Sequence, residues 1–280
     1  MHLVSCGSGT PILFIHGMPT NSSLWNGVIK RLCGSYRCFA VDLPGMGETP
    51  SRPYGADFLR YLAEQIDQIR IENEIEKWHV VGHDAGSVVA VHYARYFQEH
   101  IGCMALLSPA LFPELKPYFL LEALRTPILG EILAPLIGPI FWKIAMRRAL
   151  GSSEQRDAMV GDFYKPFSGW DGPWQFMRVL RWGKPASVLA EIPQFLPTLQ
   201  MPTLIFHGSL DPAIPKAFAH RASELIPNAS MVTLESGHFI PLNQPEPVAT
   251  RLAGFFDHHS FIHSEVACTQ ADAMATRTSY

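Results

Sequence analysis

The sequence is poor in charged residues and has no excess of basic ones. Its 22 Lys and Arg residues face 25 Asp and Glu residues, so the formal net charge is -3. A protein that binds nucleic acid neutralises phosphates with clustered cations. The charge balance therefore argues against a nucleic-acid partner.

Long apolar runs and a secretory leader are also missing. No stretch of about 18 apolar residues that could span a bilayer occurs, and the opening MHLVSCGSGT has no basic segment followed by an apolar run. We therefore expect a cytoplasmic protein without a membrane partner. The sequence admits a homodimer but does not establish an oligomeric state.

Cysteine is scarce and irregularly spaced. An odd number of scattered cysteines without a CxxC pair fits neither a disulfide framework nor a thiolate metal site. We expect reduced, mostly buried thiols, no metal and no cofactor. The five cysteines are Cys6, Cys33, Cys38, Cys103 and Cys268.

What the sequence does contain is an alternation of short apolar runs with segments of helical periodicity. Such runs are typical of strands buried on both faces of a parallel sheet. Asn21 and Asp57 stand where they can cap helices. The pattern predicts an α/β fold with a mostly parallel sheet covered by helices on both faces. The expected strands are 11–16, 37–42, 78–83, 103–108, 203–208 and 230–234, and the expected helices are 21–33, 56–72, 86–98, 215–226 and 246–258.

The strand pattern stops between residues 112 and 199. This stretch is helical in periodicity, broken by prolines, and contains four of the six tryptophans. We interpret 112–199 as a helical cap inserted into a core formed by 1–111 and 200–260. The tail, 261–280, shows no periodicity, and we expect it to be poorly ordered.

The segment HVVGHDAGS, residues 79–87, places an aspartate at a sharp turn from strand to helix. Gly82 and Gly86 lie two positions on either side of Asp84. Glycines there permit a tight backbone, which lifts the central side chain clear of the sheet. Asp84 is thus a candidate nucleophile, although an aspartate at a helix start can also serve only as a cap.

Two later loops supply an acid and a histidine. Asp211 lies in HGSLDPAIP and His238 in ESGHFIPLNQPE, each directly after a predicted strand. Because the carboxyl ends of parallel strands meet at one edge of a sheet, we expect both side chains near Asp84. The backbone N–H groups of Met18, in HGMP, and of Ala85 are placed to bind an oxyanion. Taken singly, Asp211 could be a turn former and His238 an ordinary loop histidine.

Together these motifs resemble α/β-hydrolases with an aspartate nucleophile, the group that includes epoxide hydrolases and haloalkane dehalogenases. The order nucleophile, acid, histidine along the chain is the one found in that fold. The resemblance covers about residues 3–258 and implies the α/β-hydrolase fold. It is carried by HGMP, DLPGMGET, GHDAGS, GSLDPAIP and SGHFIPLNQPE. DLPGMGET is similar to a structural turn of the family rather than a catalytic one.

An aspartate suits a different reaction from a serine. With an ordinary pKa of about 3.9, a carboxylate is ionised at neutral pH and needs no base before it attacks. Attack on an ester carbonyl gives an unfavourable anhydride, so displacement at saturated carbon is expected. The resulting ester on Asp84 is hydrolysed by water that His238 deprotonates, while Asp211 orients the imidazole.

The group that receives the leaving atom separates the subtypes. Haloalkane dehalogenases commonly hold halide with a tryptophan after the nucleophile or an asparagine after HG, and fluoroacetate dehalogenases place an arginine after the nucleophile. This chain has Ala85 and Met18 at those two positions. Epoxide hydrolases use cap tyrosines as acids, which makes Tyr164 and Tyr118 candidates. Where the family usually has its second tyrosine, this chain has Trp182, a third candidate donor.

An epoxide hydrolase acting on a bulky, apolar small molecule is therefore the first hypothesis. Substrate contacts are expected from His16, His83, Trp142 and Trp174. Three alternatives stay open. The chain is a dehalogenase with the same covalent intermediate, an ester or lactone hydrolase or lyase that uses Asp84 as a base, or a ligand-binding protein that has lost catalysis.

Overall fold

The computed structural model describes residues 1–52, 55, 57–116, 119–136, 146, 154–182 and 189–259. Its centre is a seven-stranded sheet of order β1-β3-β2-β4-β5-β6-β7. Only β1 is antiparallel, pairing with β3, and the other neighbours are parallel. The strands are β1 (Leu3–Cys6), β2 (Thr10–Ile15), β3 (Tyr36–Val41), β4 (Trp78–His83), β5 (Ile101–Leu107), β6 (Thr203–Gly208) and β7 (Ala229–Leu234). The predicted parallel α/β sheet is confirmed.

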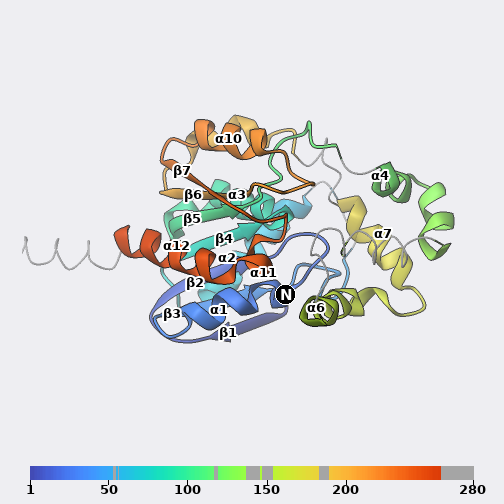
Figure 1. Ribbon diagram of the computed structural model, residues 1–280, viewed down its shortest axis with the longest axis horizontal. Helices are drawn as coiled ribbons and strands as arrows, with labels where there is room; N and C mark the ends of the chain where they lie inside the picture. The colour runs from blue at the N-terminus through green and yellow to red at the C-terminus, as the bar shows by residue number, and fades with distance from the viewer. Residues whose placement is uncertain are drawn as a thin grey trace, which may run out of the picture.

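Helices cover both faces of this sheet because each parallel pair needs a crossover. Helix α1 packs against α12, and α2 packs against α3 (Figure 1). The expected helix 21–33 is split into a 3₁₀ turn and an α-helix, and Asn21 caps that turn by accepting the N–H of Ser23. Asp57 makes no capping hydrogen bond, so that prediction was wrong. The core helices are η1 (Ser22–Trp25), α1 (Asn26–Leu32), α2 (Phe58–Glu72), α3 (Ala85–Phe97), η2 (Gln98–His100), α10 (Lys216–Leu225), α11 (Ile240–Asn243) and α12 (Pro245–His258).

A buried polar network fixes α3, the helix that starts at the predicted nucleophile. The carboxylate of Asp67 on α2 accepts hydrogen bonds from Arg70 at 2.7 Å and from the Tyr93 hydroxyl at 3.1 Å. Tyr93, on α3, accepts the indole N–H of Trp78, on β4, at 3.2 Å. These bonds join two helices and a central strand, and they pair polar groups that would be costly to bury alone.

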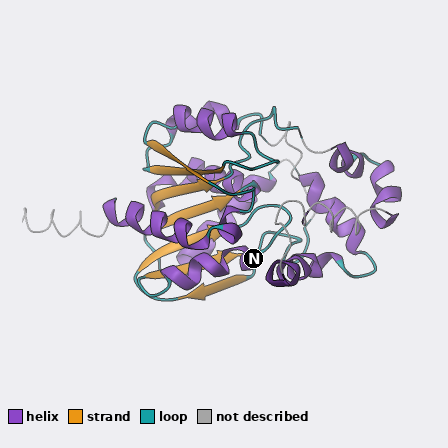
Figure 2. Cartoon of the chain, in the orientation of Figure 1, coloured by secondary structure: helices purple, strands orange, loops and turns teal. Residues whose placement is uncertain are grey.

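The described parts of the segment between β5 and β6 are helical (Figure 2). Helices α4, α6 and α7 lie together on one side of the sheet, beyond the carboxyl ends of the parallel strands (Figure 1). The elements are α4 (Phe119–Arg125), α6 (Glu154–Tyr164), η3 (Lys165–Phe167), α7 (Gly172–Trp182), α9 (Ile192–Phe195) and η4 (Leu196–Thr198).

Hydrogen bonds tie these helices to the sheet domain. The Ser23 hydroxyl donates to Asp162 on α6 at 2.8 Å, and the Gln175 amide on α7 donates to the carbonyl of Gly45 at 3.1 Å. Among the described helices, none is both long and apolar enough to cross a membrane. The expected tail, 261–280, lies outside the described residues.

Candidate active site

Asp84 occupies a strained turn between β4 and α3. Its φ of 50° and ψ of −118° are unusual for a residue with a side chain. The turn is tight because α3 starts against the end of β2. A Cβ atom on Gly86 would lie 2.3 Å from the carbonyl oxygen of Ile15. The Asp84 side chain makes no capping hydrogen bond, so the hypothesis that it serves only as a helix cap was wrong.

Two backbone N–H groups face the Asp84 carboxylate, as the sequence predicts. The N–H of Met18 donates to Oδ2 at 3.0 Å, and the N–H of Ala85 also interacts with the carboxylate. The loop carrying Met18 approaches closely because Gly17 has no side chain. A Cβ atom there would lie 2.5 Å from the Cβ of Asp84. A tetrahedral centre built on the Asp84 carboxyl carbon would have N–H donors at hand.

His238 and Asp211 complete the cluster. The Nδ1 of His238 donates to Oδ2 of Asp211 at 2.9 Å, and the other Asp211 oxygen accepts the N–H groups of Ala213 at 2.8 Å and Ile214 at 3.1 Å. The Nε2 of His238 lies 3.9 Å from Oδ1 of Asp84. The imidazole is thus held by one carboxylate with its second nitrogen directed at the other.

Burial and charge set the protonation of the three groups. Burial raises the pKa of Asp84 against the opposing effects of His238 and the two N–H groups. Burial lowers the pKa of His238, but the carboxylates of Asp211 and Asp84 outweigh it, and the net shift is upward. For Asp211, His238 and the loop N–H groups outweigh burial and hold its pKa well below the usual range. The ordinary pKa expected for Asp84 is therefore corrected upward.

Comparison with known proteins decides the family. A family model for the alpha/beta hydrolase fold matches residues 10–245. The chain belongs to the α/β-hydrolase family. It is 24% identical to a cis-3-alkyl-4-alkyloxetan-2-one decarboxylase of Shewanella oneidensis, with 95% of this chain and 88% of the relative covered. It is 27% identical to a pimeloyl-(acyl-carrier protein) methyl ester esterase of Aeromonas salmonicida, covering 84% and 90%.

A solved structure supports the same fold. The haloalkane dehalogenase of Bradyrhizobium elkani superposes with a TM-score of 0.78 at 21% identity, covering 92% of this chain and 94% of that chain. The chain is thus a hydrolase-family enzyme with the α/β-hydrolase fold. Decarboxylases, esterases and dehalogenases stand among its relatives, so the subtype depends on the residues of the site.

Two histidines expected to contact substrate have other places in this α/β-hydrolase. His16 is fully buried, donates from Nδ1 to Gly17 O at 2.8 Å and accepts the Leu43 N–H at Nε2 at 2.9 Å. His83 is also fully buried and donates from Nε2 to the carbonyl oxygen of His238 at 3.0 Å. Burial lowers the pKa of His16 to about 4 and that of His83 to about 3. Both are neutral, buried rings that hydrogen-bond to the backbone of loops, and a contact with substrate stays a prediction for each of them.

Ser108 is a site residue that the sequence reasoning missed. It directly follows β5 with a φ of 43°, is fully buried, and its hydroxyl lies 3.5 Å from the same His238 carbonyl. The backbone of His238 is therefore anchored from β4 by His83 and from β5 by Ser108. The only sequence signal was its place at the carboxyl end of a strand.

The DLPGMGET turn is held by hydrogen bonds to the Asp42 carboxylate. The buried Asp42 carboxylate accepts the N–H groups of Ser22 at 2.7 Å and Glu48 at 2.9 Å. Gly47 passes so close that a Cβ atom there would lie 2.2 Å from this carboxylate. The turn therefore connects β3, the start of η1 and the chain after Gly47, and its contacts are those of a structural element.

The predicted residues of the inserted segment are placed only in part. Tyr164 is half-buried at the end of α6, where burial raises its pKa. Trp174 is half-buried on α7, and its indole N–H donates to the carbonyl of Glu131 at 3.2 Å. Trp182 is the last residue of α7, but its side chain is not described. Tyr118 and Trp142 lie outside the described residues.

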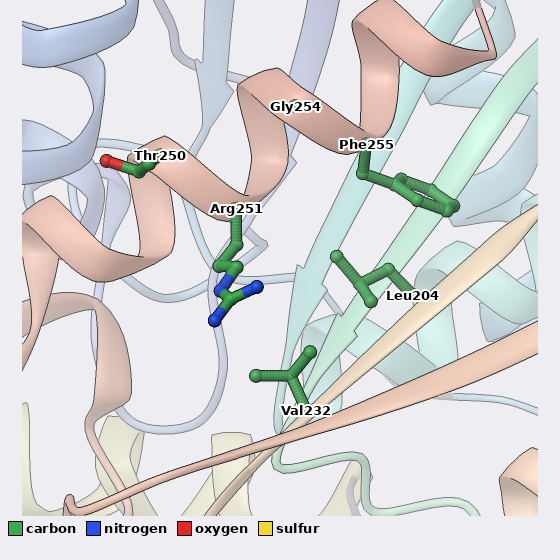
Figure 3. Close-up of a pocket in the computed structure, with 6 residues that line it drawn as sticks. All are labelled: Leu204, Val232, Thr250, Arg251, Gly254 and Phe255. Atoms are coloured by element: carbon green, nitrogen blue, oxygen red, sulfur yellow. The ribbon is translucent and has the colours of Figure 1, made fainter.

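A separate cavity lies between α12 and the β6–β7 edge. Its volume is about 450 Å³, and apolar side chains of Leu204, Val232 and Phe255 line it together with Arg251 (Figure 3). Leu204 belongs to the amino-terminal half of β6, whereas Asp211 follows the carboxyl end of that strand. The cavity is therefore not the site of the Asp84, His238 and Asp211 cluster.

Proposed function

We propose that this α/β-hydrolase opens an epoxide through a covalent ester on Asp84. The observation that carries the proposal is the Asp84 carboxylate at the strained turn, with the Met18 N–H at 3.0 Å and His238 Nε2 at 3.9 Å. A carboxylate oxygen of Asp84 attacks a ring carbon, the ring C–O bond breaks, and the alkoxide takes a proton. An ester of the substrate on Asp84 results.

The second step hydrolyses the ester and regenerates the free Asp84 carboxylate. His238 removes a proton from water, the hydroxide attacks the ester carbonyl carbon, and the N–H groups of Met18 and Ala85 hold the oxyanion. The ester C–O bond on the substrate side of the carbonyl then breaks, and the diol leaves with the proton from His238. Asp211 stabilises the imidazolium formed on the way.

We also propose that 112–199 is the cap over this site and that the substrate is bulky and apolar. The helices α6 and α7 support this role through their hydrogen bonds to the sheet domain. The aromatic content of the segment, including the half-buried Tyr164 and Trp174, supports an apolar substrate. At the two positions where haloalkane dehalogenases commonly carry a halide-binding tryptophan or asparagine, this chain has Ala85 and Met18, which cannot donate a side-chain N–H to a halide. This disfavours a dehalogenase.

A second candidate reaction is opening of an oxetan-2-one ring, favoured by the Shewanella relative that covers 95% of this chain. Attack by Asp84 on the ring carbon that bears the ring oxygen breaks that C–O bond and releases a carboxylate. This leaving group needs no proton, so a cap acid is dispensable. Loss of CO₂ would then form an alkene as Asp84 departs, without water.

Product analysis separates these reactions. Purified enzyme is incubated with an aryl or alkyl epoxide, a cis-3,4-dialkyl oxetan-2-one and a bromoalkane. The proposal expects the diol from the epoxide as the fastest reaction. Alkene and CO₂ from the oxetanone without diol formation would favour the second candidate, and bromide release without epoxide turnover would favour a dehalogenase.

Removing the Tyr164 hydroxyl is expected to slow ring opening. Tyr164→Phe should cut the alkylation rate of the epoxide by roughly 10²-fold, the usual range for loss of a general acid. Rapid-quench measurement of ester formation reads this step directly. Tyr96→Phe, at an exposed position near the end of α3, is the matched control. Full activity in a Tyr164→Phe, Tyr118→Phe double variant would exclude both tyrosines as the acid and leave Trp182 as the candidate donor to the leaving group.

The two half-reactions should differ in their dependence on pH. Alkylation needs ionised Asp84, so its rate should fall as the pH falls through the raised pKa of that residue. Ester hydrolysis needs neutral His238, so its rate should rise with pH through the pKa of the histidine. Esterification removes the charge of Asp84, one of the two carboxylates that raise this pKa. The hydrolysis midpoint should therefore lie below the His238 pKa of the free enzyme.

Single-turnover kinetics from about pH 4 to 9, beside NMR titration of His238 in the free enzyme, measure both quantities. A hydrolysis rate that does not change with pH over this range would contradict the role of His238 as base.

A further inference from the structure

Three cysteines gather at the end of the sheet opposite the Asp84 site. Cys6 ends β1 and stands opposite Cys38 in the antiparallel β1–β3 pair, while Cys33 directly follows α1. Because β3 begins at Tyr36 and runs parallel to β2, its early residues lie at the amino edge of the sheet, away from the triad. Cys6 is exposed and Cys33 is half-buried, whereas Cys38 and Cys103 are buried, so burial holds for two of the four described cysteines.

Cys6 and Cys33 are in contact. The two thiols interact, and the interaction with Cys33 raises the pKa of Cys6. The backbone also comes close, since a Cβ atom on Gly7 would lie 2.4 Å from the carbonyl oxygen and 2.9 Å from the Cα of Cys33. Gly7 has a φ of +85°, so it turns the chain at this point of contact. Disulfide formation requires such proximity of two chain segments.

We propose that Cys6 and Cys33 form a reversible disulfide when the protein meets a peroxide or a low-molecular-weight disulfide. With hydrogen peroxide, one thiol is oxidised to a sulfenic acid and a water is released. The second thiol attacks that sulfur, forms the S–S bond and releases a second water. With oxidised glutathione, two exchange steps yield the same bond and two reduced glutathione molecules.

Cys38 is an unsuitable partner despite its position opposite Cys6. Its side chain is fully buried, and its thiol lies against the carbonyl oxygen of Tyr36 at 3.9 Å. Burial raises the pKa of Cys38 to about 12, and Cys33 raises the pKa of Cys6, so access from solvent rather than ionisation distinguishes Cys6 from Cys38. An oxidant in solution reaches Cys6 and Cys33 but not Cys38.

The bond would close residues 6–33 into a loop that contains β2 and the Met18 segment. Cross-linking a loop of this length lowers the entropy of the unfolded chain. We expect the midpoint of thermal unfolding to rise by roughly 5–10 °C on oxidation and to return on reduction. This inference does not depend on the proposed function, because neither the bond nor its test involves turnover.

Peptide mapping tests the proposal on the full-length chain carrying Cys268→Ser. Trypsin places the three thiols on separate fragments, 1–30, 32–37 and 38–60, because the bond before Pro53 resists cleavage. After treatment with hydrogen peroxide or oxidised glutathione, non-reducing mass spectrometry should find 1–30 linked to 32–37. Cys33→Ser should abolish this species, and Cys38→Ala should retain it.

Three results would overturn the proposal: no linked peptide, a link from 1–30 to 38–60, or a dimer joined through Cys6. A linked protein whose thermal midpoint does not rise would overturn the stabilising effect. Cys38→Ala removes a core side chain, so its linkage is scored only where the folded state is confirmed by circular dichroism. Cys103→Ser, at a buried position on β5, serves as a second control for the same linkage.

Discussion

Asp84→Asn is expected to abolish turnover while the protein stays folded. The variant keeps the shape of the side chain and removes the charge that attacks the substrate. Loss of the nucleophile should lower kcat by roughly 10⁴-fold or more, the scale seen when a covalent catalyst is deleted. Asp84→Ala should behave alike, because the side chain packs at a turn rather than in the core. Product formation and circular dichroism measure the two effects.

Asp84→Asn should also raise the thermal stability of the protein. Burial raises the pKa of Asp84 in the folded protein, so above that pKa the folded state carries a charge that is costly to bury. Removing the charge should increase the unfolding midpoint by about 2–5 °C at pH 8. The gain should begin to shrink as the pH falls through the raised pKa of the folded protein and vanish near the ordinary aspartate pKa of about 3.9, below which Asp84 is neutral in both states.

Asp57→Asn is the matched control for both effects. Asp57 is exposed, precedes α2 and makes no capping hydrogen bond, so activity and stability should stay unchanged. Unfolding of Asp84→Asn, or retained turnover, would argue against a nucleophilic Asp84.

His238→Gln should separate the two halves of the reaction. Asp84 can still be alkylated, because attack on the ring needs no base. The ester should then persist, because no group is left to deprotonate water, and turnover should fall by roughly 10³-fold or more. Intact-mass spectrometry should show the protein heavier by the mass of one substrate molecule.

Asp211→Asn is the graded control, since it leaves the imidazole but removes the charge that orients and stabilises it. We expect slower hydrolysis with partial accumulation of the ester. Absence of any adduct in His238→Gln with a substrate that the native enzyme turns over would point to Asp84 as a base. Full turnover in that variant, with alkene and CO₂ as products of an oxetanone, would favour the second candidate reaction.

The strands and the chemistry-bearing turns could be predicted because their signals are local. Apolar runs such as 78–83 and 203–208 coincide with β4 and β6, since strands buried on both faces have no polar alternation. The glycines around Asp84 reveal a tight turn, and parallel strands bring Asp211 and His238 to the same edge. In the structure the three side chains do meet there, with His238 2.9 Å from Asp211 and 3.9 Å from Asp84.

Other features depend on contacts between distant segments and leave little local signal. The raised pKa of Asp84 comes from the burial of the whole site. His83 looks like a substrate contact beside the nucleophile, but its ring turns inward to the His238 carbonyl 155 positions along the chain. The helix cap expected of Asp57 failed because residue type alone does not fix the side-chain geometry at a helix start.

Isotope labelling of a single turnover tests the covalent account most directly. Enzyme in excess over an epoxide is mixed with substrate in ¹⁸O-water, and the peptide containing GHDAGS and the diol are analysed by mass spectrometry. If water attacks the carbonyl carbon of an ester on Asp84, the oxygen in the diol comes from the carboxylate, and the label stays in the protein. We expect ¹⁸O in Asp84 and an unlabelled diol. Label found only in the diol would contradict the covalent ester.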